Sequence, residues 1–475
     1  MSIRTFALIA LAGLLAGCAT HFVNVPLEQG ASNPERRSID VSDKSRPIIV
    51  VALSGGGSRA AALGWNVLKE LRDVRYKDRA GERRLVDDVA VVSSVSGGST
   101  IAAYYGLNGP DGLDAFEPFL VKDNVKCLAA AALNPFAWIG HAFDGGSRTE
   151  FVVDLFNQDL FHDRKMAELN QPGKPFVILN STDMAGGEVF SFRPDMFDNV
   201  CSKLDEFPIA TAVATSADVP IIFAPSALAN YNYDINNTAK RCGWVPTPSW
   251  IANRLDAQYA QYINLPVYLS ARYANDLRRG PEPFRDIRYL YLVDGGLADN
   301  AGIHSLLSTI NSPQDPAGLL RLLNNSELNR LVVIVVNARS DTVPGEYTSP
   351  NRPGLVSMFD SVSGVPINST TAGVIVQLND ALAQIGEFAR SKGAHVYNVL
   401  IDFDQFRARI PEQKELRDLA KAVPTSWTLS AQDRLVLGRS ATLLLHQHPC
   451  FQRLLIDLDV KEPYIDPVFA NTGCP

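Results

Sequence analysis

The sequence has few of the residues that build metal centres or nucleic-acid surfaces. Its 475 residues include only six cysteines and seven histidines, and they form no Cys-x-x-Cys or His-x-x-x-His spacing. A structural metal site is therefore not expected. Lysine and arginine total 44 against 51 aspartates and glutamates, a net charge of −7. Without a broad cationic face to neutralise phosphates, nucleic acid is not expected as a partner. No cofactor is predicted either.

Long apolar runs are also scarce, and the overall composition is that of a folded globular protein. Hydrophobic residues make up 46% of the chain and charged residues 20%, which excludes disorder, collagen and a coiled coil. The length suits one large α/β domain or two ordinary domains, and it can bury a core without metal or disulfide staples.

Residues 1–17 have the features of a secretory signal peptide. One cation, Arg4, precedes an apolar run that begins at Phe6 and is too short to span a bilayer. The run ends in Leu-Ala-Gly-Cys at positions 15–18, which resembles the bacterial lipobox, and this resemblance implies a diacylglycerol anchor on Cys18. The alternative is an ordinary signal peptide with a chance cysteine. Residue 20 is Thr rather than Asp, which by resemblance to enterobacterial lipoproteins implies the outer membrane, facing the periplasm.

The segment after the anchor and the remaining cysteines give two further expectations. Residues 18–46 are polar, contain two prolines and have no apolar periodicity, so we predict a tether. An exported chain can oxidise its five other cysteines, and their odd number leaves at least one free. By proximity alone, Cys201 with Cys242 and Cys450 with Cys474 are plausible pairs.

Two units of strand, glycine turn and helix follow one another near the start of the folded part. Residues 48–53 form an apolar run before a glycine turn at 54–59, and residues 89–92 precede a Ser/Gly turn at 93–98. Uninterrupted apolar strands in such units indicate a parallel sheet that is buried on both faces, with ligands bound at its carboxyl edge. Further strands are expected at 176–180, 189–192, 289–293, 331–336 and 395–401, and helices at 148–159, 209–216, 370–391 and 431–446.

Ser96 lies between an apolar strand and a predicted helix, with small residues on both sides. A serine in such a tight turn can present its hydroxyl above the sheet at the positive end of a helix, which is the nucleophile-elbow arrangement. The usual pattern is Gly-x-Ser-x-Gly, whereas this segment has Ser94 in the first glycine position and Gly97 and Gly98 after the serine. The alternative is a turn in which Ser96 or Ser99 caps the helix.

Three consecutive glycines, Gly55, Gly56 and Gly57, follow the first strand. Their backbone can direct several N–H groups to one point, which suits a phosphate or the oxyanion of an acyl-transfer intermediate. Arg59 follows them in the first turn of the predicted helix, where a cation opposes the helix dipole and calls for an anionic partner.

The same glycines also match a relaxed dinucleotide-binding fingerprint, Gly55-x-Gly57-x-x-Ala60. Asp73 and Asp78 lie at about the distance expected of a ribose-binding acid. A ribose-binding acid lies at the end of the strand that follows the glycine-rich turn and its helix, however, whereas residues 60–73, which lead up to Asp73, are predicted to be helical. The fingerprint is therefore a weak indication of nucleotide binding.

Asp294 ends the predicted strand 289–293 and is followed by two glycines, which let another loop approach its carboxylate closely. The alternative is an ordinary Asp-Gly turn. We expect the strand before it to be buried rather than alternating, which argues against a simple hairpin turn.

Taken in order, the glycine turn at 54–59, the turn at Ser96 and Asp294 with its two glycines resemble the patatin-like phospholipase family. Residues 175–190 resemble its central strand pair, and residues 214–220 resemble its Ala-Ser-x-Ala-x-Pro segment. The departures are Ser94 in the first elbow glycine position and a longer stretch before the aspartate. The resemblance implies a three-layer α/β/α fold with a mostly parallel central sheet. A hydrolase core would cover 47–310, and a C-terminal α/β extension of the same domain would cover 311–475.

The resemblance further implies a Ser–Asp catalytic dyad. Asp294 would take the proton of Ser96 as the hydroxyl attacks an ester carbonyl, and the amides of Gly55, Gly56 and Gly57 would hold the oxyanion. Arg59 would anchor this loop or favour an anionic head group. A triad that includes His304 is the alternative, although the family's matching motifs contain no histidine.

These features predict a membrane-anchored serine acyl-ester hydrolase, similar to phospholipase A or a lysophospholipase, that acts on phospholipid or other acyl-ester lipids. A lipidated Cys18 would hold the site near a membrane. Residues 230–291 contain eight of the 14 tyrosines and are expected in part as an insertion over the sheet edge. These tyrosines form either an interfacial rim or ordinary core and surface. The alternative functions are an acyltransferase with the same dyad, a lipoprotein that binds lipid or protein without turnover, and a nucleotide-binding protein.

Overall fold

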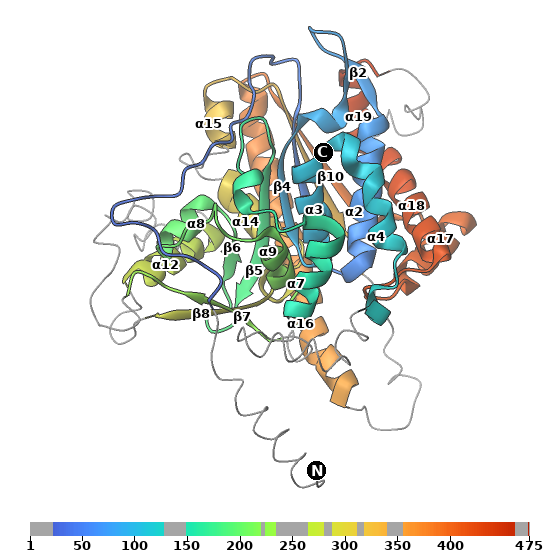
Figure 1. Ribbon diagram of the computed structural model, residues 1–475. Coiled ribbons are helices and arrows are strands. Elements are labelled where there is room, and N and C mark those ends of the chain that lie inside the picture. Colours follow the sequence, from blue (N-terminus) through green and yellow to red (C-terminus); the bar gives the residue numbers. More distant parts are fainter. Residues whose placement is uncertain are drawn as a thin grey trace.

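Strands and helices alternate along most of the chain in the computed structural model (Figure 1), and each strand and helix expected above is present. The structure describes residues 22–127, 149–219, 224–233, 265–279, 287–310, 318–339, 355–460 and 474. The strands are β1 Ile48–Leu53, β2 Arg75–Lys77, β3 Glu82–Arg84, β4 Val89–Val95, β5 Phe176–Asp183, β6 Val189–Ser191, β7 Ser226–Ala229, β8 Tyr289–Asp294, β9 Arg330–Asn337 and β10 His395–Asp402. The helices are α2 Gly57–Asp73, α3 Gly97–Asn108, α4 Glu117–Val121, α7 Glu150–Phe156, α8 Pro194–Asn199, α9 Ile209–Ser216, α12 Leu265–Arg279, α13 Gly296–Asp299, α14 Ile303–Ile310, α15 Leu319–Asn324, α16 Leu355–Ser391, α17 Pro411–Ala422, α18 Ala431–His446 and α19 Pro449–Asp457.

The central sheet is mostly parallel. Its strand order is β10-β9-β1-β4-β5-β8-β7, with β6 paired to β5. The five strands from β10 to β5 run parallel, while β6, β7 and β8 run antiparallel to their neighbours. Because β9 and β10 come from the C-terminal extension, that part of the chain continues the same sheet beyond β1.

Helices cover both faces of this sheet, which makes the predicted three layers. In β1, side chains alternate between the two helical layers, as the period of two in a strand requires. Ile49, Val51 and Leu53 pack with α2, α3 and α18, whereas Ile48, Val50 and Ala52 pack with α14, α15 and α16. Both faces of the strand are therefore buried, which explains its uninterrupted apolar sequence.

Two strands of opposite direction end against each other beside β5. In the parallel pair, Val95 at the end of β4 lies opposite Asn180. In the antiparallel pair, Asp294 at the end of β8 lies opposite Ser181, the next residue of β5. Because β6 occupies the other edge of β5 at both positions, β4 and β8 share one edge. Ser96, the residue that follows β4, is therefore brought next to Asp294, the residue that ends β8.

Residues 22–46 lie along the body of the domain, so the prediction of a tether is wrong for them. The side-chain amide of Asn24 donates to Ser202 Oγ (3.1 Å) and to the Ala229 carbonyl (3.0 Å). Asn33 donates from its backbone and side-chain nitrogens to Asp198 Oδ1 (2.7 Å each). Hydrogen-bonded polar side chains hold this segment, which a search for apolar periodicity does not detect. Residues 1–21, with the predicted signal peptide and Cys18, lie outside the described residues.

The cysteines are oxidised largely as expected. Cys450 and Cys474 form a disulfide bond, which confirms that predicted pair, and Cys127 is a free thiol. Cys201 is also disulfide-bonded, and its predicted partner, Cys242, lies outside the described residues.

The tyrosines of residues 230–291 have different environments. Tyr231, Tyr233 and Tyr273 are buried, Tyr289 and Tyr291 are exposed, and positions 259 and 262 lie outside the described residues. The two exposed tyrosines alternate with buried leucines in the first half of β8. The prediction of a strand buried on both faces is thus wrong for this part, because β8 belongs to the antiparallel end of the sheet. Within the described residues, no helix is long and apolar enough to cross a bilayer.

Candidate active site

Ser96 occupies a strained turn between β4 and α3. Its backbone angles are φ 51° and ψ −124°, a conformation that residues with a side chain rarely adopt. A Cβ on Gly97 would overlap the backbone of Gly57, and one on Gly98 would come within 2.6 Å of the Ser54 carbonyl oxygen. Only glycine fits at these two positions, because the turn lies directly against the loop after β1.

The Ser96 hydroxyl donates a hydrogen bond to Asp294 Oδ2 over 2.8 Å. The other carboxylate oxygen, Oδ1, accepts the backbone amide of Gly296 (2.7 Å). Both side chains are buried. Burial raises the pKa of Asp294 to about 6, although the hydrogen bonds from Gly296 and Ser96 oppose the shift. The carboxylate is consequently a stronger base than an exposed aspartate, and it contacts the hydroxyl whose proton it would take.

A set of buried hydroxyl groups fixes the two strand ends that carry the dyad. Ser216 Oγ, at the end of α9, accepts the backbone amide of Ser96 (2.9 Å) and donates to the Asn180 carbonyl (2.6 Å). Thr182 Oγ1 donates to the Asp294 carbonyl (2.9 Å). Ser94 Oγ lies 3.1 Å from Ser99 Oγ, so the serine in the first elbow glycine position takes part in this network.

Ser216, Asn180 and Thr182 were not identified as site residues from the sequence. Ser216 lies in the segment 214–220 that resembles a family motif, and the other two lie in the strand that resembles the family's central pair. Those resemblances marked the segments. The roles of the three side chains become visible only once β5 and α9 are placed beside the two strand ends.

The glycine loop after β1 presents two backbone amides beside the elbow. Gly55 donates its amide to the Asn300 carbonyl (2.9 Å), so that amide is already engaged. Within the described residues, the amides of Gly56 and Gly57 have no hydrogen-bond acceptor. The φ angles of Gly56 and Gly57, 137° and 60°, favour glycine. Both amides lie at the N-terminus of α2, where unpaired N–H groups and the helix dipole favour negative charge.

Arg59 is buried, with 3% of its surface exposed. Its Nε donates to the Ala338 carbonyl (2.8 Å) and its Nη1 to the Val423 carbonyl (2.6 Å). Burial lowers the pKa of Arg59 to about 10. The expectation of an anionic partner is wrong, because two backbone carbonyls take that place in the described part of the chain. This geometry corresponds to anchoring of the glycine loop rather than to a contact with a head group.

The alternatives that involve His304 and a nucleotide find no support in the geometry. The carboxylate of Asp294 is held by Ser96 and Gly296, and no hydrogen bond within the described residues joins the His304 ring to either dyad residue. The backbone amide of His304 donates to Asp299 instead. Asp73 ends helix α2 and Asp78 turns the hairpin between β2 and β3, so neither follows a second strand of the parallel sheet.

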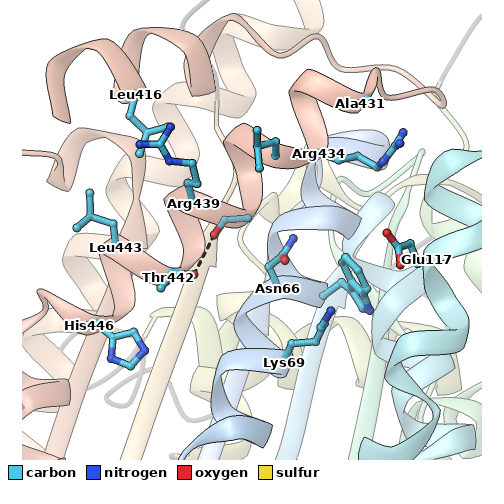
Figure 2. A pocket seen from close by; sticks show the side chains of 13 residues that line it. Asn66, Lys69, Glu117, Leu416, Ala431, Arg434, Arg439, Thr442, Leu443 and His446 are labelled. Carbon is cyan, nitrogen blue, oxygen red and sulfur yellow. Dashed lines mark hydrogen bonds between the residues drawn. The ribbon is translucent and has the colours of Figure 1, made fainter. Parts of the chain in front are cut away.

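A surface groove of about 820 Å³ lies apart from the dyad, between α2, α4, α17 and α18 (Figure 2). Lys69 faces Thr442 and His446 across it, and none of the dyad or glycine-loop residues lines it. Glu70 of α2 accepts the hydroxyl of Thr442 (2.6 Å) and lies 2.9 Å from His446 Nε2. The groove thus marks where α18 packs along α2. Within the described residues, no group of three acidic, histidine or cysteine side chains is arranged to hold a metal ion.

Comparison with known proteins finds a match to one family model. The model of the patatin-like phospholipases matches residues 51–307, which contain the glycine loop, Ser96 and Asp294. Among solved structures, the chain is similar to human GIVD cytosolic phospholipase A2, with 12% identity and a TM-score of 0.44 over 87% of this chain and 62% of that one. The same enzyme in complex with methyl gamma-linolenyl fluorophosphonate gives 12% identity and a TM-score of 0.42 over 88% and 59%. This chain therefore spans less than two thirds of the human enzyme. No curated protein sequence gives a significant match.

Proposed function

The chain belongs to the patatin-like phospholipase family, and we propose that it is a lipid acyl hydrolase that uses Ser96 as nucleophile and Asp294 as base. One observation carries this proposal: the Ser96 hydroxyl donates to Asp294 Oδ2 over 2.8 Å. A serine hydroxyl is a weak nucleophile until a neighbouring base accepts its proton. The substrate class that the family suggests is the acyl ester of a phospholipid or related lipid.

The first half of the reaction forms an acyl-enzyme. Ser96 Oγ attacks the carbonyl carbon of the ester while Asp294 Oδ2 accepts its proton, and the Gly296 amide on Oδ1 keeps the carboxylate in place. The negative charge that develops on the carbonyl oxygen is held by the free amides of Gly56 and Gly57. Asp294 then returns the proton to the leaving alkoxide. In the second half, Asp294 takes a proton from water as the water attacks the acyl carbonyl, and it returns that proton to Ser96 Oγ as the carboxylic acid leaves.

An acyltransferase would use the same residues, with an alcohol in place of water in the second half. No geometry among the described residues distinguishes the two outcomes, and hydrolysis is the proposal because water needs no binding site of its own. The engaged dyad argues against a lipoprotein that binds without turnover, since a binding protein has no need for a strained serine held on a buried carboxylate.

We also propose that Cys18 carries a lipid anchor in a bacterial envelope. The expected location is the outer membrane, with the protein facing the periplasm. Phe22, four residues after Cys18, stacks on Tyr289 at the start of β8 (ring centroids 5.3 Å apart). Four residues span at most about 14 Å. An anchored lipid would therefore hold this end of β8 close to the membrane surface.

Ester release tests the proposed chemistry. The chain without residues 1–18 is incubated with phospholipid vesicles and with a short soluble ester, beside its Ser96→Ala and Asp294→Ala variants. We expect both variants to lose activity by more than about a hundredfold, while His304→Ala keeps most of it. A folded protein that is inactive on both substrates, or a Ser96→Ala variant that stays active, would refute the serine hydrolase. Recovery of activity only when an alcohol acceptor is added would identify a transferase.

A further inference from the structure

The glycine loop is held from outside by the C-terminal extension. Beyond the family match, which ends at residue 307, the described part of the chain adds β9, β10 and the helices from α15 to α19. Figure 1 shows α18 beside α2, the helix that begins in the glycine loop, and α17 next to α18. Between α17 and α18 lies a short connection, residues 423–429, which we name the clamp loop.

The clamp loop contacts the first turn of α2 through two backbone carbonyls. The carbonyl of Ser426 accepts the amide of Ser58 (2.8 Å), and the carbonyl of Val423 accepts Arg59 Nη1 (2.6 Å). Gly57 lies so close to Ser426 that an added Cβ would come 2.5 Å from its carbonyl oxygen. The clamp loop therefore contacts all of the residues from Gly57 to Arg59.

A second contact comes from the end of β9. The backbone amide of Ala338 donates to Ser54 Oγ (2.8 Å), and its carbonyl accepts Arg59 Nε (2.8 Å). The side chain of Arg59 thus joins the glycine loop to both β9 and the clamp loop. Removing one of these carbonyls would leave part of a buried cation without a partner, which is costly.

The clamp loop has its own internal supports. Ser426 Oγ donates to the Thr428 carbonyl (2.5 Å), which closes a tight turn. Thr428 Oγ1 donates to Asp123 Oδ1 (2.9 Å), and the Trp427 ring packs on Phe156 with centroids 5.5 Å apart. The Ser426 hydroxyl therefore fixes the turn in which the Ser426 carbonyl accepts the backbone amide of Ser58.

Such a restraint matters because three consecutive glycines have more accessible conformations than any other tripeptide. The first N–H groups of a helix have no partner within it. The Ser426 carbonyl accepts the N–H group of Ser58, while the N–H groups of Gly56 and Gly57 have no acceptor among the described residues. Donors for an oxyanion accelerate a reaction only when they are fixed before the charge develops.

We propose that Ser426 and Arg59 are positioning residues, through which the C-terminal extension holds the amides of Gly56 and Gly57 in the geometry needed for catalysis. This inference rests on the proposed function, because it assigns these amides to the oxyanion. It gives residues beyond the family match a direct role in turnover.

The test compares two serines of the extension that each stabilise local backbone. Ser426→Ala removes the hydroxyl that closes the clamp-loop turn. Ser430→Ala, four residues later, removes the N-cap of α18, whose Oγ accepts the amide of Asp433 (3.0 Å), and it serves as the structural control. For Ser426→Ala we expect kcat on a soluble ester to fall by about tenfold, with KM within about twofold, because misplaced donors affect the transition state more than ground-state binding. Ser426→Thr, which keeps the hydroxyl, should restore kcat.

Ser430→Ala should lower the melting temperature and leave kcat unchanged. Equal kcat values for Ser426→Ala and Ser430→Ala would overturn the positioning role. If Ser426→Ala does not fold, Arg59→Lys replaces it. A lysine has no second nitrogen with which to reach both carbonyls, so kcat should again fall, and an unchanged kcat would overturn the inference.

Ser96→Ala in the same assay separates the two proposals. If the native protein has no Ser96-dependent activity the proposed function fails, whereas an active native protein with an unaffected Ser426→Ala refutes only the clamp.

Discussion

The carboxyl group of Asp294 is buried, and its two hydrogen-bond donors, Ser96 and Gly296, are neutral. In the part of the chain that the structure describes, no cation offsets the cost of its charge, so its pKa rises to about 6. Between about pH 4 and pH 6 the folded protein thus binds a proton that the unfolded chain has already released. The contribution of the Asp294 carboxyl to the free energy of unfolding therefore falls as the pH rises across that window. The charged carboxylate of Asp294, the proposed catalytic base, is consequently destabilising at neutral pH.

Asp294→Asn should therefore stabilise the protein while it abolishes activity. Asparagine keeps the shape and can accept the Gly296 amide, but it carries no charge. From the shift in pKa, the gain in the free energy of unfolding is at most about 3 kcal/mol at pH 7.5 and falls to about 1 kcal/mol at pH 4.5. Urea denaturation of both proteins at the two pH values measures it. A gain that is the same at both, or a variant less stable at pH 7.5, would contradict this account.

At the scale of single residues, the sequence singled out Ser96 and Asp294 because each follows an apolar strand and is flanked by glycine, and the structure joins the two side chains by a hydrogen bond. It was not enough to orient Arg59. Position in the first turn of a helix suggested an anionic partner, whereas the guanidinium turns toward the carbonyls of Ala338 and Val423. Those carbonyls are about 280 and 360 positions away in the chain, and nothing in the local pattern indicates them.

At the scale of elements, the elbow between β4 and α3 depends on its close approach to the loop after β1. Gly97→Ala places a methyl group into the backbone of Gly57, and no side chain there can move aside. We expect a loss of activity of at least about tenfold and a lower melting temperature, since the added group forces the oxyanion loop and the elbow apart.

The matched control for that substitution is Gly373→Ala. Gly373 lies on an exposed part of helix α16, and apart from the backbone of its own helix no atom of the described residues comes within 4 Å of an added Cβ. Alanine there should leave activity unchanged and stabilise the helix by up to about 1 kcal/mol. Comparable losses in the two variants would show that the close approach at Gly97 is not what the elbow requires.

Sequence periodicity located the elements well but not their directions. The apolar runs of β1, β4, β5 and β9 indicate strands buried on both faces, and the structure agrees. The first half of β8 alternates, and β8 runs antiparallel to β5. Strand direction is set by connections and long-range pairing, which a local pattern does not contain. Yet this reversal is what brings Asp294 to the end of β4.

At the scale of the whole molecule, the exposed start of β8 extends past the end of β5, the strand beside which the dyad lies. Leu292 pairs with Asp183, the last residue of β5, and the Tyr291 carbonyl accepts the amide of Met184. The exposed fractions of Tyr289, Tyr291 and Met184 are 39, 38 and 55%. Tyrosine and methionine on an exposed surface suit a membrane interface, and Phe22 brings the proposed anchor to the same place. We infer that the surface at the start of β8 faces the membrane.

Replacing both Tyr289 and Tyr291 with serine tests that orientation. Activity on phospholipid vesicles should fall by about fivefold, which corresponds to about 1 kcal/mol of interfacial binding, while activity on a soluble ester stays the same because the dyad is untouched. Phe388→Ser is the control: Phe388 is an exposed aromatic residue near the end of α16, which leads into the start of β10 at the opposite edge of the sheet. Equal vesicle activity in all three proteins, or an equal loss on both substrates, would place the membrane elsewhere. A loss confined to vesicles would indicate that the dyad, the start of β8 and the segment at Phe22 all face one lipid surface. An ester could then reach Ser96 directly from the bilayer.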